Sequence, residues 1–327
     1  MQKVLFAAVA LAAAAMVGST AVGIDAGSDS RPTKYVILYS PNGTTAMKAA
    51  VVKAGGRVLK ANNRVGVATA ISADPGFSAR AGASKVIQGV ARNHAIGRAT
   101  PKLRPKVSEE QLRSIRKAAK GLGAVPRKSG GFRYQHGGNR AEPLADLQWD
   151  MRMIHATTSG SYRKEKGSKR VLVGILDTGI DGNHPDIAPN FNRSLSRNFT
   201  TDIPSIDGPC EVPSCKDPND VDENSHGTHV ASTVASPING LGMAGVAPNV
   251  TLVNLRAGQD SGFFFLQPSV DALTAAGDLG IDVVNMSYFI DPWLYNCGNP
   301  LHPVPQDTSP LSRAEQKTII DATQRAL

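Results

Sequence analysis

Two short segments contain side chains that could do chemistry. Asp177 follows the apolar run 170–176 (RVLVGIL), and forty-nine residues later His226 opens the segment 226–231 (HGTHVA). A histidine that is held by a carboxylate can take a proton from a reacting group, while the carboxylate fixes the ring tautomer and stabilises the charged ring. The two segments therefore predict an acid–base site, provided that the fold brings Asp177 and His226 together.

A metal site is the alternative for the histidines. His226 and His229 are three residues apart and could share one face of a helix. Zinc sites of the HExxH kind need a glutamate beside the first histidine and a second histidine four residues on, and this segment has neither. We therefore interpret His229 as a structural residue.

The three cysteines leave their pairing open. Cys210 and Cys215 are five residues apart in a loop rich in Pro, Asp and Gly, so a local disulfide is possible there. A zinc site is weakly supported, because no second cysteine pair follows. Cys297 has no obvious partner in the sequence.

Alternating strands and helices would position these groups. The apolar runs 170–176, 250–255 and 281–286 are typical of strands buried on both faces, and the stretches 226–235 and 269–276 are helical in pattern. This alternation predicts an α/β fold with a doubly wound parallel sheet, in which catalytic groups collect beyond the carboxyl ends of the strands. His226 would lie in the first turn of a helix, with backbone freedom supplied by Gly227. A last helix over 312–327 opens with the capping box Ser312-x-x-Glu315.

A separate small unit precedes this part of the chain. We predict a strand from Lys34, a helix over 44–54, strands over 57–61 and 65–71, and a second helix over 78–90. Such a β-α-β-β-α unit of about 65 residues is marginally stable alone, so a larger partner surface would help it to stay folded.

The ordered motifs carry a resemblance. The segments VLVGILDTGIDGNHPDI, NSHGTHVASTVAS, GMAGVAPNVTLV and IDVVNMS follow one another in this sequence. In order and spacing they resemble the subtilisin-like (subtilase, S8) serine proteases over residues 141–327, and the region from Tyr35 to Val90 resembles the inhibitor-I9-like propeptide of that family. The resemblance implies a secreted serine endopeptidase that acts on protein and peptide substrates. It further implies the N-terminal part of a subtilisin-like sheet, on which a small α+β propeptide domain docks.

The resemblance assigns roles to four residues. Asp177 matches the triad aspartate of the family, and His226 matches its general base. Ser287 and Gly262 match positions on the two edges of the substrate cleft, where main-chain hydrogen bonds hold an extended peptide by strand addition.

A structural calcium site is also implied. Asp186 and Asn239 match oxygen ligands of family members that bind calcium between these loops, and hard oxygen donors suit that ion. We expect no organic cofactor.

The sequence departs from the family in one major respect. The nucleophile of subtilases lies in a G-T-S-M-A motif, which does not occur in these 327 residues, and the strand with the oxyanion-hole asparagine is missing as well. Smaller departures are Ser232 in place of the usual glycine, and Tyr-Phe-Ile at 288–290 in place of a glycine-containing run. We therefore expect an N-terminal piece of a protease precursor that is inactive as given, truncated before the catalytic serine. The alternative is a non-catalytic protease inhibitor or folding aid built on the propeptide domain.

The remaining expectations concern location and domains. A single Lys3, the apolar run 4–17 and the small residues 18–21 predict a signal peptide over 1–21 and hence secretion. We expect a propeptide domain over 33–100, a basic linker with a processing site over 101–140, and the incomplete catalytic domain over 141–327.

The charge is divided between these parts. The net charge of +9 combines +18 on the first 140 residues with −9 on the rest. We hypothesise that this opposition helps the propeptide domain to dock. A uniformly basic nucleic-acid binder is disfavoured, and we expect neither a nucleic-acid partner nor, after removal of the signal, a membrane partner. We expect a monomer.

Overall fold

The computed structural model describes residues 32–99, 142, 144–288 and 311–327. The predicted signal peptide 1–21, the linker 101–140 and Cys297 lie outside the described residues. No helix in the described ranges is long and apolar enough to span a bilayer.

An antiparallel sheet forms the N-terminal part. Its strand order is β2-β3-β1-β4. The central strand β1 is buried from Tyr35 to Tyr39, and its Ile37 and Tyr39 share a core with Met47 and Phe77 of the two helices. The elements are β1 (Thr33–Tyr39), α1 (Thr44–Lys53), β2 (Arg57–Asn62), β3 (Val67–Ser72), α2 (Phe77–Gly82) and β4 (Ile87–Arg92).

The predicted helix over 78–90 is wrong in its second half. Helix α2 ends at Gly82, and the chain then returns as β4, which pairs antiparallel with β1 through Ile37 and Val90. The physical reason is tertiary, because β4 satisfies the edge of β1 that faces away from β3. A β-branched side chain such as Val90 is also well suited to a strand.

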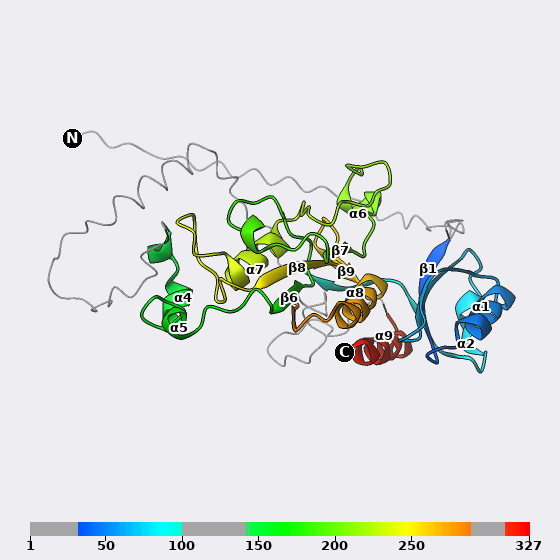
Figure 1. The fold of residues 1–327 in the computed structure, drawn as a ribbon. Coiled ribbons are helices and arrows are strands. Elements are labelled where there is room, and N and C mark those ends of the chain that lie inside the picture. The colour runs from blue at the N-terminus through cyan, green and yellow to red at the C-terminus, as the bar shows by residue number, and fades with distance from the viewer. Residues whose placement is uncertain (1–31, 100–141, 143, 289–310) are drawn as a thin grey trace, which may run out of the picture. The chain divides into compact units, whose positions relative to one another are not determined.

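The second sheet is parallel and confirms the predicted α/β class. Its order is β10-β6-β8-β7, so strands far apart in the chain lie side by side (Figure 1). β6 and β8 pair in register from Leu172 and Thr251 onward. The strands are β6 (Leu172–Ile175), β7 (Arg197–Asn198), β8 (Thr251–Arg256) and β10 (Val283–Asn285).

Two helices cover opposite faces of this sheet. Leu252 of β8 packs in one cluster with α7 (His226–Ala235), whereas Val253 and Leu255 pack in another with α8 (Leu266–Leu279). Alternate residues of a strand point to opposite faces, so the two clusters lie on either side of β8. The predicted helix over 226–235 is confirmed as α7 at the same bounds. The helix predicted over 269–276 is confirmed as α8, which is longer than the prediction at both ends.

Shorter elements connect these layers. β5 (Ala95–Arg98) pairs antiparallel with β9 (Phe263–Phe265), and Figure 1 shows β9 close to α8. The others are η2 (Ala145–Leu147), α4 (Trp149–Met153), α5 (Ser161–Lys164), η3 (Ala188–Asn190) and α6 (Pro204–Asp207).

The last helix contacts the N-terminal sheet. Helix α9 (Arg313–Ala326) begins with the predicted capping box, in which Ser312 and Glu315 satisfy each other's backbone N–H groups. The Glu315 carboxylate also accepts hydrogen bonds from Arg92 of β4, with the Nε to Oε1 distance at 2.9 Å. At the other end of α9, Arg325 donates to the Tyr39 carbonyl at 2.8 Å.

Helix α8 contacts the same sheet through its polar face. The Asn62 amide of β2 donates to Asp271 at 3.1 Å and to Thr274 at 2.9 Å. Lys60 forms an ion pair with Asp271 at 2.6 Å. Basic and amide groups of the N-terminal sheet therefore meet acidic groups of α8 and α9.

Candidate active site

Asp177 lies just beyond the carboxyl end of β6 and is fully buried. Its Oδ1 accepts the backbone N–H of Thr178 at 2.7 Å and faces His226 Nδ1 at 2.8 Å. Its backbone carbonyl accepts N–H groups of Ala257 and Gly258, both at 3.0 Å, after β8. The segment after β8 therefore fixes the main chain of Asp177, and Thr178 and the first residue of α7 fix its side chain.

A tight turn places His226 at the start of α7. Ser225, immediately before it, has a φ of 74°, a left-handed conformation that is unusual for a serine. The Asp222 carboxylate holds this turn, because it accepts the N–H groups of Ser225 at 2.8 Å and of Thr228 at 2.9 Å. Asp222 also accepts the hydroxyl of Thr178 at 3.0 Å, so it joins the turn to the residue next to Asp177.

Gly227 has a different role from the one expected. Its backbone is not left-handed, so the predicted supply of backbone freedom is wrong. A Cβ at this position would overlap the carbonyl oxygen of Gly179. Glycine is therefore needed here for the close approach of α7 to the segment after Asp177, which brings the His226 ring within reach of the carboxylate.

The pair has the electrostatics of a proton-transfer unit. The hydrogen bond to Asp177 raises the pKa of His226, although burial opposes the shift. Burial raises the pKa of Asp177, and the hydrogen bond from His226 opposes it. With Nδ1–H donating to Asp177, the ring presents Nε2 as its basic nitrogen, and the ring is 16% exposed.

The two predicted cleft residues lie next to different strands. Gly262 precedes β9 with a φ of 84°, and its carbonyl accepts the N–H of Ala99 at 2.8 Å. The edge at Gly262 is thus paired with the chain's own segment that contains β5. Ser287 follows β10 and is exposed, and its hydroxyl accepts the Asn285 amide at 2.9 Å.

The predicted calcium ligands lie near a carboxylate that sequence reasoning missed. Asp186 accepts the N–H of Met243 at 3.1 Å, and Glu142 accepts that of Gly240 at 3.1 Å, so both bind the loop that contains Asn239. Asp186 Oδ1 and Glu142 Oε2 are buried without a hydrogen-bond partner. Burial raises the pKa of both carboxyl groups. Such orphaned oxygens fit a hard cation.

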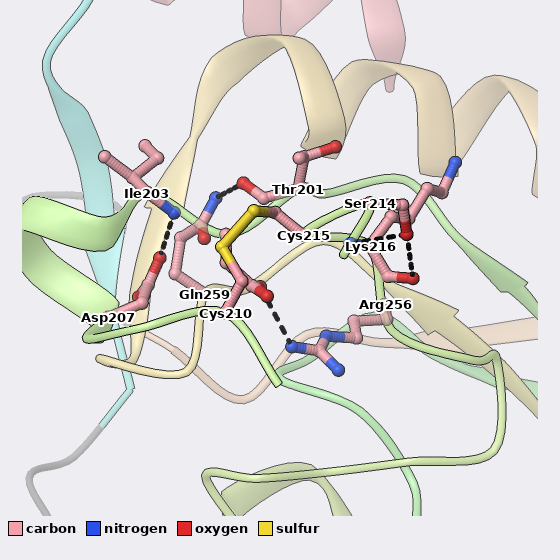
Figure 2. Close-up of a disulfide and its surroundings, with 10 residues drawn as sticks. Thr201, Ile203, Asp207, Cys210, Ser214, Cys215, Lys216, Arg256 and Gln259 are labelled. Atoms are coloured by element: carbon pink, nitrogen blue, oxygen red, sulfur yellow. Dashed lines mark hydrogen bonds and ion pairs between the residues drawn. A yellow bond between two sulfur atoms is a disulfide. The ribbon is translucent and has the colours of Figure 1, made fainter. Parts of the chain in front are cut away.

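A disulfide closes the loop before α7. Cys210 and Cys215 are bonded, which resolves the pairing that the sequence left open. Figure 2 shows the bond with Gln259 and Arg256 nearby. The Gln259 amide donates to Thr200 at 2.5 Å, so a segment that precedes the disulfide is tied to the segment that follows β8.

Sequence reasoning also missed two supporting residues of the acid–base pair. Asp222 lies four residues before His226, whereas Ser225 occupies the N-cap position, so the capping rule does not point to Asp222. Thr178 donates its hydroxyl to Asp222 and accepts the N–H of Gly227 at 3.0 Å. No pattern in one sequence predicts that link.

One known family and several known proteins resemble this chain. Residues 168–319 match the Peptidase S8 subtilase family. The thermophilic serine proteinase of Bacillus sp. (strain AK1) is 32% identical over 159 residues, which cover 48% of this chain and 32% of that protein. Subtilisin DY of Bacillus licheniformis is 37% identical over 117 residues, which cover 36% of each. The chain thus spans about a third of the length of these relatives.

Solved structures share the fold. The epidermin leader peptide processing serine protease EpiP from Staphylococcus aureus matches with a TM-score of 0.56 and 22% identity, over 91% of this chain and 57% of that one. Fervidolysin from Fervidobacterium pennivorans, described as a keratinolytic enzyme related to subtilisin, matches with a TM-score of 0.52 and 20% identity. The match covers 90% of this chain and 38% of fervidolysin.

Proposed function

We propose that this chain, whose residues 168–319 form a subtilase-family domain, belongs to a secreted serine endopeptidase precursor of the subtilisin type. Asp177 and His226 would be two members of its Asp-His-Ser triad. The observation that carries the proposal is the 2.8 Å contact between Asp177 Oδ1 and His226 Nδ1 beyond the end of β6. The relatives named above are serine proteases, which supports the reaction class.

The proposed mechanism is acyl transfer. His226 Nε2 would take the proton of a serine hydroxyl as it attacks the scissile carbonyl, and would return it to the leaving amine. Asp177 would hold Nδ1–H and stabilise the charged ring. The 327 residues contain no G-T-S-M-A motif, and loss of a triad serine costs about 10⁶ in turnover in a member of this family. We therefore expect these residues alone not to hydrolyse peptides.

Two experiments test the proposal. In the 327-residue chain, NMR should find a raised pKa for His226 that falls on Asp177→Asn; a pKa that this substitution leaves unchanged would remove the basis of the assignment. The coding DNA beyond codon 327 should continue into a G-T-S-M-A motif, and a product with that continuation should cleave peptides and lose this activity on His226→Ala. A stop codon together with detectable folded protein would count against a protease.

Residues 33–100 are the second part of the proposal. They would act as an intramolecular inhibitor that docks on α8 and α9 and covers the edge at Gly262 with β5. The pairing of Ala99 N–H with the Gly262 carbonyl at 2.8 Å favours this role, as does the Arg92–Glu315 pair. The peptide 33–100 should inhibit subtilisin DY at micromolar concentration, and the absence of inhibition would contradict the role. If the chain has no catalytic continuation, inhibition by this part would be its function.

Calcium would have a structural role in the proposed protease. Asp186, Asn239 and Glu142 would supply its oxygen ligands, and the ion would fasten residues 239–243 to Asp186. The two orphaned carboxylate oxygens support this assignment. Addition of Ca²⁺ should raise the melting temperature of the chain, and Asp186→Asn should reduce that gain.

A further inference from the structure

The strand β5 shows what the edge of β9 can hold. It pairs antiparallel with β9, and Arg98 lies opposite Phe263. The Ala99 N–H continues the ladder, because it donates to the Gly262 carbonyl at 2.8 Å. A peptide that adds to a sheet edge gains affinity from main-chain hydrogen bonds and specificity from the places that its side chains occupy. The side chains of residues 95–99 therefore indicate which peptides this edge prefers.

The C-terminal end of β5 lies beside the turn that places His226. A Cβ added at Gly262 would lie 3.2 Å from the Asn224 amide nitrogen and 3.5 Å from the Ala99 Cβ. Asn224 stands two residues before His226, and its amide donates to the Asp260 carbonyl at 2.8 Å. A peptide that follows the path of β5 therefore approaches the acid–base pair with its C-terminal end.

Ile96 is the apolar anchor of β5. The register shifts by one residue between Ala95 and Gly97, so Ile96 is bulged out of the ladder, and such a bulge re-aims its side chain. Ile96 is 5% exposed and belongs to the core cluster that includes residues of α8. An aliphatic side chain therefore suits this position. Ile96 borders an apolar pocket whose other walls include Leu266, Val270, Leu273, Met286 and Tyr288.

Arg98 lies against an aromatic ring. Its guanidinium carbon is 4.8 Å from the centre of the Phe263 ring, within the range of a cation–π contact. The net charge of −9 on residues 141–327 also favours a cation on this surface. A basic side chain is therefore preferred two places after the aliphatic one.

The place of Ala99 suits a small side chain. Ala99 is 2% exposed and belongs to the same core cluster as Phe264, which follows Gly262 by two residues. The Phe264 ring is stacked on Tyr288, with ring centres 3.7 Å apart and the planes at 7°. Tyr288 directly follows Ser287, so this stack joins the two predicted edges of the cleft. A larger side chain in place of Ala99 would have to displace such packed neighbours.

We propose that the edge of β9 recognises peptide strands in which an aliphatic residue, a spacer, a basic residue and a small residue follow one another. Residues 96–99 (IGRA) have this pattern and occupy the site in the chain itself. Protein substrates with the same pattern would take the site once β5 has left it, and they would be cut on the C-terminal side of the pattern. This last step rests on the proposed protease function, whereas peptide binding does not.

Peptide binding to the full 327-residue chain tests the proposal. Ala99→Pro removes the N–H that donates to Gly262, so it should free the edge and speed hydrogen exchange of the β9 amides. A fluorescently labelled peptide AIGRA should bind this variant in an anisotropy titration. It should bind the wild type, in which β5 occupies the edge, at least about tenfold more weakly.

Single replacements in the peptide separate the side-chain contacts. Serine in place of isoleucine should weaken binding about tenfold, and leucine in place of the last alanine should do the same. Glutamine in place of arginine should weaken binding about threefold. Serine in place of the first alanine is the matched control and should bind as AIGRA does, because Ala95 does not border the pocket. Equal affinities for all these peptides, or no binding of AIGRA to a freed edge, would overturn the proposal.

Hydrogen exchange in the intact chain gives a second test, which stands even if Ala99→Pro does not fold. Ile96→Ser and Arg98→Gln should speed exchange of the Ala99 amide, and Ala95→Ser should not. Unchanged exchange in the first two variants would overturn the proposal. A product with the catalytic continuation that cleaves no peptide, while AIGRA still binds selectively, would contradict the protease function alone. An active product with equal kcat/KM for substrates that contain AIGRA or ASGQA would overturn the assignment to substrates.

Discussion

The Arg92–Glu315 contact allows a quantitative test of how the N-terminal sheet is held. Glu315 accepts hydrogen bonds from the backbone N–H and Nε of Arg92, both at 2.9 Å, and from the Ser312 N–H at 2.8 Å. Although burial acts to raise it, these bonds hold the pKa of Glu315 at about 2. Replacement of Glu315 should therefore destabilise the contact between β4 and α9.

The magnitude follows from the pKa. A shift of the Glu315 pKa from 4.5 to about 2 corresponds to roughly 3 kcal/mol at about 1.36 kcal/mol per unit. The Arg92 side chain is 44% exposed, so screening by solvent reduces this figure to about 1–2 kcal/mol. Glu315→Gln keeps the capping box, because glutamine can replace glutamate there, and removes the charge alone. Glu315→Ala removes both the charge and the capping box, and it should cost about 1 kcal/mol more than Glu315→Gln.

Urea denaturation of the 327-residue chain at pH 7 measures these free energies, and hydrogen exchange of the β4 amides locates the effect. Lys317→Gln is the control, since its pair with Asp321 is on the surface and should contribute less than about 0.5 kcal/mol. Because the folded pKa of Glu315 is depressed, its contribution should be complete above about pH 4.5 and lost as the pH falls through about 2. The reasoning would be refuted if Glu315→Gln were no less stable than Lys317→Gln. It would also be refuted if the contribution of Glu315 to stability did not change between about pH 5 and about pH 2.

Three further outcomes are expected. Gly227→Ala should destabilise the chain by about 2 kcal/mol or more in urea denaturation, because the added Cβ overlaps the Gly179 carbonyl, and a loss below about 0.5 kcal/mol would contradict that packing. Asp222→Ala should cost about 2–3 kcal/mol and increase amide exchange in the first turn of α7, since it removes the acceptor for that turn. The bond to Asp177 raises the pKa of His226, so its stabilisation should be complete below about pH 6.5 and fall as the pH rises through the raised pKa. Asp177→Asn should remove that pH dependence in denaturation curves, and an unchanged dependence would contradict the pairing.

The sequence predicted those features that have a local pattern. The apolar run before Asp177 and the helix from His226 follow from periodicity, and the capping box at Ser312 follows from residue type and spacing. The parallel sheet followed from the alternation of such segments.

Features that depend on distant contacts were not predictable in the same way. The residues of β4 have a helical pattern, and their pairing with β1 cannot be seen in a local window. The left-handed conformation of Ser225 likewise depends on its hydrogen bond to Asp222, and the short strand β5 depends on its pairing with β9. Glu142 is separated by almost a hundred residues from the loop that it binds, so no spacing rule could find it.

The pairing of β10 with β6 has a consequence for the order of folding. Val283 lies beside Val173, and the neighbouring Leu172 N–H bonds Asp282 across a separation of 110 residues. Contacts of such long range form slowly, whereas β2 and β3 pair across a short turn and can form early. During synthesis the N-terminal sheet would therefore exist before the parallel sheet can close. We expect it to serve as the preformed surface onto which α8 and then α9 settle.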